Sequence, residues 1–246
     1  MNLGSGGSAY NAVMYNSPTV SVTDQVVGSA AVEFNSALCQ YIQIPSFRTA
    51  SSGISVACWF KSTSSGDSSQ IFEFSAGYTD DVIVGYPNDI ISFSVSFNDG
   101  VVEATVEATI ESDSNLFGIN LNDGVWRHFA WTIDIGGDWL LYLNGKLVHS
   151  LTSYGYPLSV NRTSNYLGTS GIAFSDSCLD GAIDEFYFFQ SVISASTVQA
   201  LYNQALTAPT SSPSMIMSKR LLSSYCCFLV LTNSLKLFII KALIRL

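Results

Sequence analysis

The chain has 246 residues, of which 48% are hydrophobic and 12% are charged, with 18 glycines and 6 prolines. This composition excludes a collagen-like or disordered chain, and the length suits one large all-β domain or two small domains. The formal net charge of −9 argues against nucleic acid as a partner.

Charge divides the chain into two parts. Residues 1–213 hold all 19 acidic residues against five basic ones, a net charge of −14, whereas residues 214–246 hold five basic residues and no acidic one. Such asymmetry is typical of physically different segments. We therefore expect a flexible N-terminus over residues 1–9, one folded domain over 10–206, a Ser/Thr/Pro linker over 207–214 and an apolar, basic tail over 215–246.

Short apolar runs that alternate with polar residues predict β-strands through most of the domain. The expected strands cover residues 32–34, 41–44, 54–60, 71–74, 82–86, 90–97, 101–110, 126–135, 138–143, 146–149, 166–168 and 183–189. In the run at 54–60, the alternation places Trp59 on the face opposite Ile54 and Val56. Asn144-Gly145 lies between two such runs and predicts a type I′ hairpin turn.

One helix is expected after the last strand. Ser196 and Gln199 have the spacing of a capping box. Val198, Leu201 and Tyr202 then begin an apolar stripe with the helical period, which Ala205 continues. Many short strands and one terminal helix predict a β-sandwich or jelly roll in a single domain.

The five cysteines are odd in number and irregularly spaced, a pattern that fits neither a disulfide framework nor a zinc site. One bridge among Cys39, Cys58 and Cys178 stays open as an alternative. We expect buried thiols instead, because a free cysteine packs as a small hydrophobe. Residues 1–12 have no basic start and no apolar run, so no signal peptide is expected there.

The tail over residues 221–246 is strongly apolar and basic. Its charge-free run, residues 221–235, is shorter than the ~20 residues that a membrane-spanning helix needs, and Lys236 and Lys241 follow it. Three interpretations stay open: a marginal membrane anchor or interfacial helix, a gene-model error after the linker, and a structural helix that docks on the sandwich.

The sequence contains no Gly-x-Ser-x-Gly, phosphate-loop or His-Glu-x-x-His motif. Its two histidines, His128 and His149, are expected at the surface or at a sheet edge. Glu103 and Glu107 share a strand face but lie ~13 Å apart along the strand, too far for the carboxylate pair of a retaining glycosidase. We therefore expect a non-catalytic protein.

Five stretches together resemble the motifs of laminin-G-like, concanavalin A-like jelly-roll domains, in the family's order. They are residues 32–45, 54–61, 123–130, 139–148 and 179–189, the last of which leads into the helix through Tyr202. The resemblance covers about residues 10–206. It implies an all-β fold, a two-sheet antiparallel jelly-roll sandwich with one short C-terminal helix, followed here by the apolar tail.

The resemblance also implies a structural Ca²⁺, because many relatives hold one through the acid of their closing motif and oxygens near the first strands. Carried over to this chain, the ligands are Asp184 and carbonyl oxygens supplied by Asn35 or its neighbours. Relatives bind glycans or extracellular proteins, which implies an extracellular or cell-surface location.

We thus expect a binding module for carbohydrate or for a cell-surface or matrix partner. Sugar recognition needs an exposed aromatic platform with polar groups beside it. The candidate platform residues are Trp59, Tyr78, Tyr86, Trp139, Tyr154 and Tyr156. Two alternatives stay open, a diverged glycoside hydrolase or polysaccharide lyase of the same fold and a purely structural adhesion domain.

Overall fold

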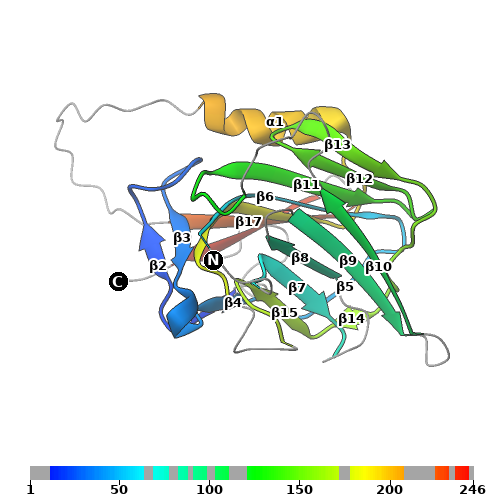
Figure 1. Ribbon diagram of the computed structural model, residues 1–246, viewed down its shortest axis with the longest axis horizontal. Coiled ribbons are helices and arrows are strands. Elements are labelled where there is room, and N and C mark those ends of the chain that lie inside the picture. Colours follow the sequence, from blue (N-terminus) through cyan, green and yellow to red (C-terminus); the bar gives the residue numbers. More distant parts are fainter. Residues whose placement is uncertain are drawn as a thin grey trace.

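The architecture is known from a computed structural model. It describes residues 12–63, 69–77, 83–87, 91–98, 103–110, 121–171, 178–207, 225–232 and 236–243. Two antiparallel sheets are stacked face to face, and a helix lies over one of them (Figure 1). This arrangement confirms the predicted jelly-roll sandwich.

The first sheet has seven strands. Their order across the sheet is β1 (Val13–Tyr15), β4 (Tyr41–Gln43), β15 (Ser164–Leu167), β7 (Phe72–Ser75), β8 (Ile83–Pro87), β9 (Ile91–Asn98) and β10 (Glu103–Ile110). All neighbours in this sheet run antiparallel.

The second sheet has nine strands. Its main path is β13 (Lys146–Leu151), β12 (Trp139–Leu143), β11 (Arg127–Ile133), β6 (Ile54–Ser62), β16 (Gly181–Phe189), β17 (Tyr225–Thr232) and β18 (Lys236–Leu243). β3 (Ala31–Phe34) pairs with β16 and with β2 (Thr19–Ser21), while β5 (Phe47–Arg48) and β14 (Asn161–Arg162) form a separate pair.

Phenylalanine is the most frequent residue among the described residues of the core between the two sheets. Phe72 and Phe93 of the seven-stranded sheet both contact Phe129 of the nine-stranded sheet, with ring centroids 6.2 and 5.3 Å apart. Because side chains alternate along a strand, the neighbours of these residues face the other side of each sheet. The face of the seven-stranded sheet that points away from the core is called the outer face below.

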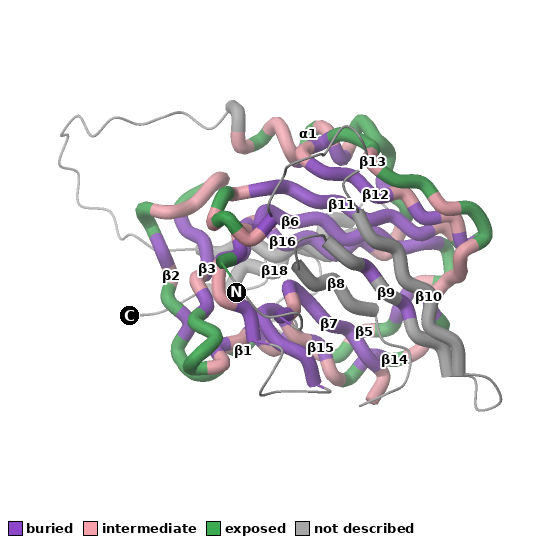
Figure 2. The backbone as a smooth tube through the Cα atoms, viewed as in Figure 1, coloured by how far each residue is buried: buried purple, intermediate pink, exposed green. Residues whose placement is uncertain are grey.

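The helix α1 (Ala195–Thr207) covers the far side of the nine-stranded sheet. Val198 and Leu201 of α1 pack on Ala57, Ala130 and other residues of that side. As a result, the strand β11 is buried on both faces along its whole length and β6 along nearly all of it, and neither is half-exposed (Figure 2). The backbone N–H of Thr197 donates to Ser194 Oγ at 3.2 Å, so the cap is Ser194 and not the predicted Ser196.

The Asn144-Gly145 turn is confirmed. Asn144 and Gly145 have φ angles of 49° and 78°, the left-handed values that a type I′ turn needs at both central residues. The turn joins β12 to β13, as the sequence predicts.

The tail forms strands and not a helix over its described residues. β17 pairs in parallel with β16, and β18 pairs antiparallel with β17. Both tail strands are rich in aromatic and branched apolar residues, which suit a pleated sheet. No helix within the described ranges is long and apolar enough to cross a membrane.

Candidate functional site

Three tyrosines gather on the outer face of the seven-stranded sheet. Tyr15 lies on β1, Tyr41 on β4 and Tyr166 on β15, which are consecutive strands. The core side of these strands is occupied by Ile42 and Leu167, both fully buried, so the alternating tyrosines face away from the core. We call Tyr15, Tyr41 and Tyr166 the tyrosine cluster.

The tyrosine cluster has a defined ring geometry. Tyr15 and Tyr41 are directly opposed in the strand register, and their rings are stacked with centroids 4.8 Å apart and planes 8° apart. Tyr166 meets Tyr41 edge to face at 5.8 Å. Tyr15 is 38% exposed, and the other two are half-buried. The cluster therefore offers aromatic surface together with phenol groups that can donate or accept hydrogen bonds.

Tyr41 is held neutral by its surroundings. Partial burial is the main cause that raises its pKa, and the neighbouring Tyr15 and Tyr166 raise it further. A neutral phenol keeps its O–H donor at any physiological pH.

A buried carboxyl lies beside the cluster. Glu73 of β7 is directly opposed to Tyr166 and is fully buried. Its carboxyl accepts hydrogen bonds from the hydroxyls of Ser170 and Ser75 and from the backbone N–H of Gly171. Burial nevertheless raises the pKa of Glu73, because it outweighs these hydrogen bonds. Glu73 is thus a fixed polar group next to the tyrosines.

Gly171 is required for this close fit. A Cβ atom added there would lie 3.0 Å from the Tyr166 ring and 3.2 Å from a Glu73 carboxyl oxygen. A side chain at position 171 would require the Tyr166 ring and the Glu73 carboxyl to move away from it.

The outer face does not bring a catalytic carboxylate pair together within the described strands. Glu73 is opposed to Val84, Val84 to Ser94 and Ser94 to Glu107, so the two glutamates share one row across the sheet. Three strand spacings separate them by roughly 14 Å at the backbone. Glycosidases hold their carboxylates at ~5–9.5 Å. The nearest match in the sequence to the Glu-x-Asp-x-Glu spacing of two carboxylates on one strand face is Glu111 with Asp113, and both lie outside the described residues.

The two tryptophans named as candidate platforms are core residues. Trp139 is fully buried, and its Nε1 donates to the carbonyl oxygen of Gly155 at 2.6 Å. Trp59 is 6% exposed and stacks on Tyr202 of α1, with ring centroids 5.4 Å apart. Trp59 does face away from the core between the sheets, as predicted, but α1 covers that face. Neither ring is open to a sugar.

Of the four candidate tyrosines, two have side chains that the structure describes, and both of these are held by contacts within the protein. Tyr154 packs edge to face on Trp139, and Tyr156 donates its hydroxyl to the carbonyl oxygen of Ala50 at 2.6 Å. The backbone of Tyr86 is opposed to Ser92, but its side chain is outside the described part of the structure, as is the whole of Tyr78. Among the candidates whose side chains are described, the structure brings Trp139 and Tyr154 into contact, against the core.

His128 is buried and not at the surface, contrary to the expectation. It lies beneath α1 against Trp59 and Tyr202, and neither ring nitrogen has a hydrogen-bond partner among the described residues. Burial lowers the pKa of His128 to about 3. His149 is exposed on β13, as predicted.

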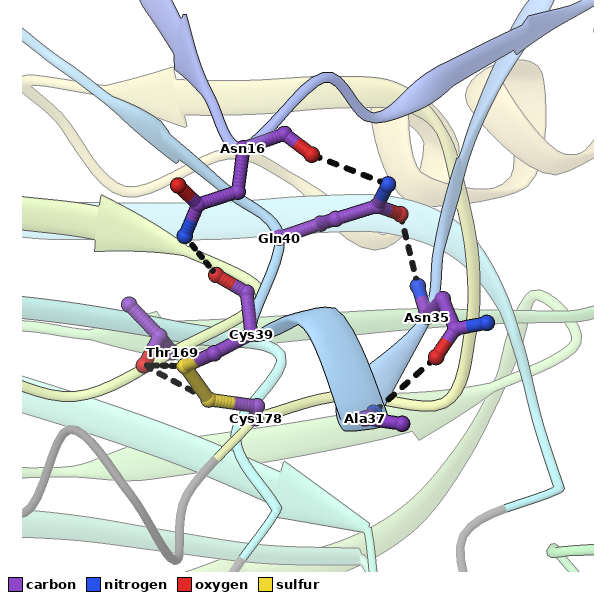
Figure 3. The surroundings of a disulfide bond; sticks show 7 residues. All are labelled: Asn16, Asn35, Ala37, Cys39, Gln40, Thr169 and Cys178. Carbon is purple, nitrogen blue, oxygen red and sulfur yellow. Dashed lines mark hydrogen bonds between the residues drawn. A yellow bond between two sulfur atoms is a disulfide. The ribbon is translucent and has the colours of Figure 1, made fainter.

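One disulfide bond stands close to the tyrosine cluster. Cys39 and Cys178 are bridged, with Cα atoms 5.2 Å apart, whereas Cys58 is a buried thiol (Figure 3). The expectation of free thiols is therefore wrong for Cys39 and Cys178 and right for Cys58. Sequence spacing could not reveal the pair, because 139 positions separate its members.

Asp184 is buried and only partly satisfied. Its Oδ2 accepts hydrogen bonds from the backbone N–H groups of Val26 and Val27, both at 2.9 Å. Its Oδ1 has no partner among the described residues, and the same holds for Oε1 of nearby Gln25. Burial raises the pKa of Asp184 to about 6. Carboxylate and amide oxygens are ligands that a hard cation such as Ca²⁺ accepts. Among the described residues, no group of three or more His, Cys, Asp or Glu side chains gathers around a common point.

Asn35 does not join Asp184. Phe34 is opposed to Gly181 and Val32 to Ile183, so the chain at Asn35 lies at the start of β16, roughly 13 Å along the strand from Asp184. The Asn35 side chain instead accepts from the N–H of Ala37 at the start of the short 3₁₀ helix η2 (Ser36–Leu38). Gln25 was not identified from the sequence, because nothing in its local pattern indicates that its Oε1 atom is buried.

Two stacked, mainly antiparallel sheets with this strand order define a jelly-roll sandwich. The chain belongs to the concanavalin A-like lectin/glucanase superfamily, whose family model matches residues 37–199. No curated protein matches the sequence.

Solved structures share the fold at low identity. The binding domain of Paraclostridial Mosquitocidal Protein 1 matches with a TM-score of 0.63 and 15% identity, over 82% of this chain and 49% of that one. Domain 4 of AbnA, a GH43 extracellular arabinanase from Geobacillus stearothermophilus, was solved in complex with arabinotriose. It matches with a TM-score of 0.61 and 17% identity, over 80% of this chain and 91% of that one.

The binding domain of botulinum neurotoxin DC, solved in complex with SialylT, has a TM-score of 0.58 and 12% identity, over 82% of this chain and 48% of that one. The chain thus spans about half the length of the toxin domains it resembles. At these identities, the three structures show that the chain shares their fold.

Proposed function

We propose that this chain is a non-catalytic carbohydrate-binding module that holds a neutral glycan against the tyrosine cluster. The observation that carries the proposal is the partly exposed group of Tyr15, Tyr41 and Tyr166 on the outer face. Aromatic rings stack on the apolar faces of sugar rings, and phenol groups beside them satisfy sugar hydroxyls. The arabinotriose complex of AbnA domain 4 supports this reading for the fold.

The charge of the outer face favours a neutral glycan over an acidic one. The seven strands of this sheet contain Glu73, Glu103 and Glu107 but no lysine or arginine. A carboxylate on the glycan would meet no compensating cation on these strands. Sialylated and other acidic glycans are therefore the weaker candidates.

The disulfide supports an extracellular location. Stable bridges such as Cys39–Cys178 form in secreted and surface proteins and are rare in the cytosol. A glycan ligand suits the same compartment.

The first prediction concerns Tyr41, which contacts both other members of the cluster. We expect Tyr41→Ala to weaken glycan binding by about tenfold or more, because one aromatic stacking partner is worth about 1.5 kcal/mol. A glycan array identifies the ligand and isothermal titration calorimetry measures the loss.

The matched control is Leu147→Ala, an exposed apolar residue on β13 of the other sheet, which should leave the affinity unchanged. Equal losses in both variants would contradict the assignment of the site. A folded wild-type chain that retains no neutral glycan would contradict the function itself and would favour the structural adhesion domain.

We also propose a structural Ca²⁺ at Asp184. The residues that would hold it are Asp184, through Oδ1, and Gln25, through Oε1, with Asn35 left out. Ca²⁺ prefers six to eight oxygen ligands, and a bound ion would tie the loop that contains Gln25 to β16.

The second prediction is therefore that Ca²⁺ raises the melting temperature of the wild-type chain and that EGTA reverses the rise. Asp184→Asn should remove this response, because it deletes the only charged ligand, while Asp138→Asn in a distant turn should keep it. Differential scanning calorimetry and a Ca²⁺ titration provide the measurements. A flat response of the wild-type chain in both would rule the ion out.

One observation favours an enzyme as the second candidate. Glu73 is a buried carboxyl with a raised pKa on the same face as the tyrosine cluster, which is the usual state of a general acid. Release of reducing sugar from a polysaccharide by the wild-type chain, lost in Glu73→Gln, would establish this candidate. Binding without turnover would support the module.

A further inference from the structure

The stacked tyrosine pair is flanked by strained backbone. Asn16 and Ser17, which follow Tyr15, have φ angles of 59° and 55°, and Cys39, two residues before Tyr41, has a φ of 43°. Residues other than glycine adopt the left-handed region at a cost of about 1 kcal/mol or more, so other contacts must hold this conformation. The strand β1 supplies few of these contacts, because it has only three residues and lies at the sheet edge.

The side chain of Gln40 supplies these contacts. It is 6% exposed, and its Nε2 donates to the carbonyl oxygens of Asn16 at 3.0 Å and Ser17 at 2.8 Å. Its Oε1 accepts from the backbone N–H of Asn35 at 2.8 Å. One amide thus joins the turn after Tyr15 to the turn before Tyr41, and Figure 3 shows it between Asn16 and Asn35.

The disulfide fixes the other side of the same turn. Asn16 Nδ2 donates to the carbonyl oxygen of Cys39 at 2.8 Å, and Cys39 is bonded to Cys178 (Figure 3). The hydroxyl of Thr169, two residues after the strand of Tyr166, lies 3.6 Å from the sulfur of Cys178. The bridge therefore links the turns next to all three members of the tyrosine cluster.

We propose that Gln40 and the Cys39–Cys178 bridge are positioning elements of the tyrosine cluster, and that reduction of the bridge switches glycan binding off. The inference rests on the proposed function and adds its regulation. A dithiol reductant transfers two electrons and two protons to the bridge, which breaks the Sγ–Sγ bond, gives two thiols and leaves the reductant as a disulfide. Cys39 is then free to leave its left-handed conformation, and Tyr15 can separate from Tyr41.

The test uses the full chain labelled with 3-fluorotyrosine, in which Tyr15→Phe and Tyr41→Phe assign the two signals. Stacked rings shift each other's ¹⁹F resonance, so the spectrum reports the ring pair without any ligand. We expect Gln40→Met, which keeps the shape but loses all three hydrogen bonds, to move both signals toward the unstacked position. The same variant should weaken glycan binding by about tenfold.

The matched control is Gln190→Met. The side-chain amide of Gln190 also joins two backbone groups: it donates to the carbonyl oxygen of Arg48 and accepts from the N–H of Ala50. Gln190 is remote from the tyrosine cluster. It should change the melting temperature as Gln40→Met does, yet leave both ¹⁹F signals and the affinity unchanged. A purely structural role of Gln40 would instead make the two variants alike.

A milder variant keeps the test decisive if Gln40→Met does not fold. Gln40→Glu still accepts from Asn35 but places a carboxylate oxygen against the carbonyls of Asn16 and Ser17. We expect it to unstack the rings at neutral pH and to recover partly in acid, because the protonated carboxyl regains one donor. The wild-type spectrum should not show this recovery.

Reduction provides the second arm. With dithiothreitol, below the melting temperature of the reduced chain, both ¹⁹F signals should move and the affinity should fall at least tenfold, reversibly on reoxidation. Unmoved signals with an unchanged affinity would overturn the inference. Moved signals in a chain that binds no glycan in either state would sustain the positioning role and refute the proposed function, so the two failures are distinguishable.

Discussion

Replacement of Trp139 by alanine is expected to lower the free energy of unfolding by about 3–5 kcal/mol. The side chain is fully buried and packs edge to face on Trp131 and Tyr154, with ring centroids 4.8 and 5.0 Å away. Alanine would leave a large cavity among rigid rings and would remove the hydrogen bond to Gly155. Chemical denaturation with an unchanged m-value gives the measurement.

The conservative variant Trp139→Phe separates the two contributions. It keeps an aromatic ring but leaves the Gly155 carbonyl without its donor, so a loss of about 1–3 kcal/mol is expected. Neither variant should change glycan affinity while the chain is folded. A fully stable Trp139→Ala variant with weakened glycan binding would restore Trp139 as a platform residue and remove it from the core.

The sandwich could be predicted because its signals are local. The alternation at residues 91–98 and the Asn144-Gly145 turn each determine backbone geometry through neighbours in the sequence. The helix was predicted for the same reason. Its N-cap residue is Ser194 and not the predicted Ser196, because both serines precede the apolar stripe and the sequence does not distinguish them.

The residues that α1 buries could not be predicted from the sequence. Trp59 alternates with core residues, and a one-sided sheet would leave its ring exposed to solvent. The stacking of Tyr202 on Trp59 instead depends on where the chain returns after β16, about 140 positions further along. The burial of His128 follows from the same packing.

The tyrosine cluster was missed because it depends on strand order. Tyr41 alternates with Ile42, which could have marked it as outward-facing, but residues 13–15 were not expected to form a strand. Tyr15 and Tyr166 become its neighbours only through pairing of β1 and β15 with β4. The pairing register also explains why Asn35 lies away from Asp184, which the sequence alone could not show.

The burial of His128 predicts how stability depends on pH. The unfolded chain binds a proton at His128 near pH 6.5, whereas the folded chain, in which burial lowers the pKa to about 3, does not. The unfolded state therefore binds more protons at His128 between these values, so the contribution of His128 to the free energy of unfolding is highest above pH 6.5 and falls as the pH falls toward 3. The loss amounts to about 4 kcal/mol.

Two buried carboxyls change the free energy of unfolding with pH in the opposite direction. Burial raises the pKa of Glu73 and of Asp184, so their contributions to stability fall as the pH rises through their folded pKa values. The contribution of His128 is therefore measured as a difference, from denaturation curves of the wild-type chain and of His128→Leu between pH 7 and pH 4.

His128→Leu should lack the acid-induced loss that the wild-type chain shows. It should be at least as stable at pH 7, because leucine removes two ring nitrogens that have no hydrogen-bond partner among the described residues. His149→Leu on the exposed strand β13 is the control and should follow the wild-type curve. If His128→Leu kept the full acid-induced loss, protonation beneath α1 could not be its cause, and the packing of α1 over His128 would have to be looser than Trp59 and Tyr202 indicate.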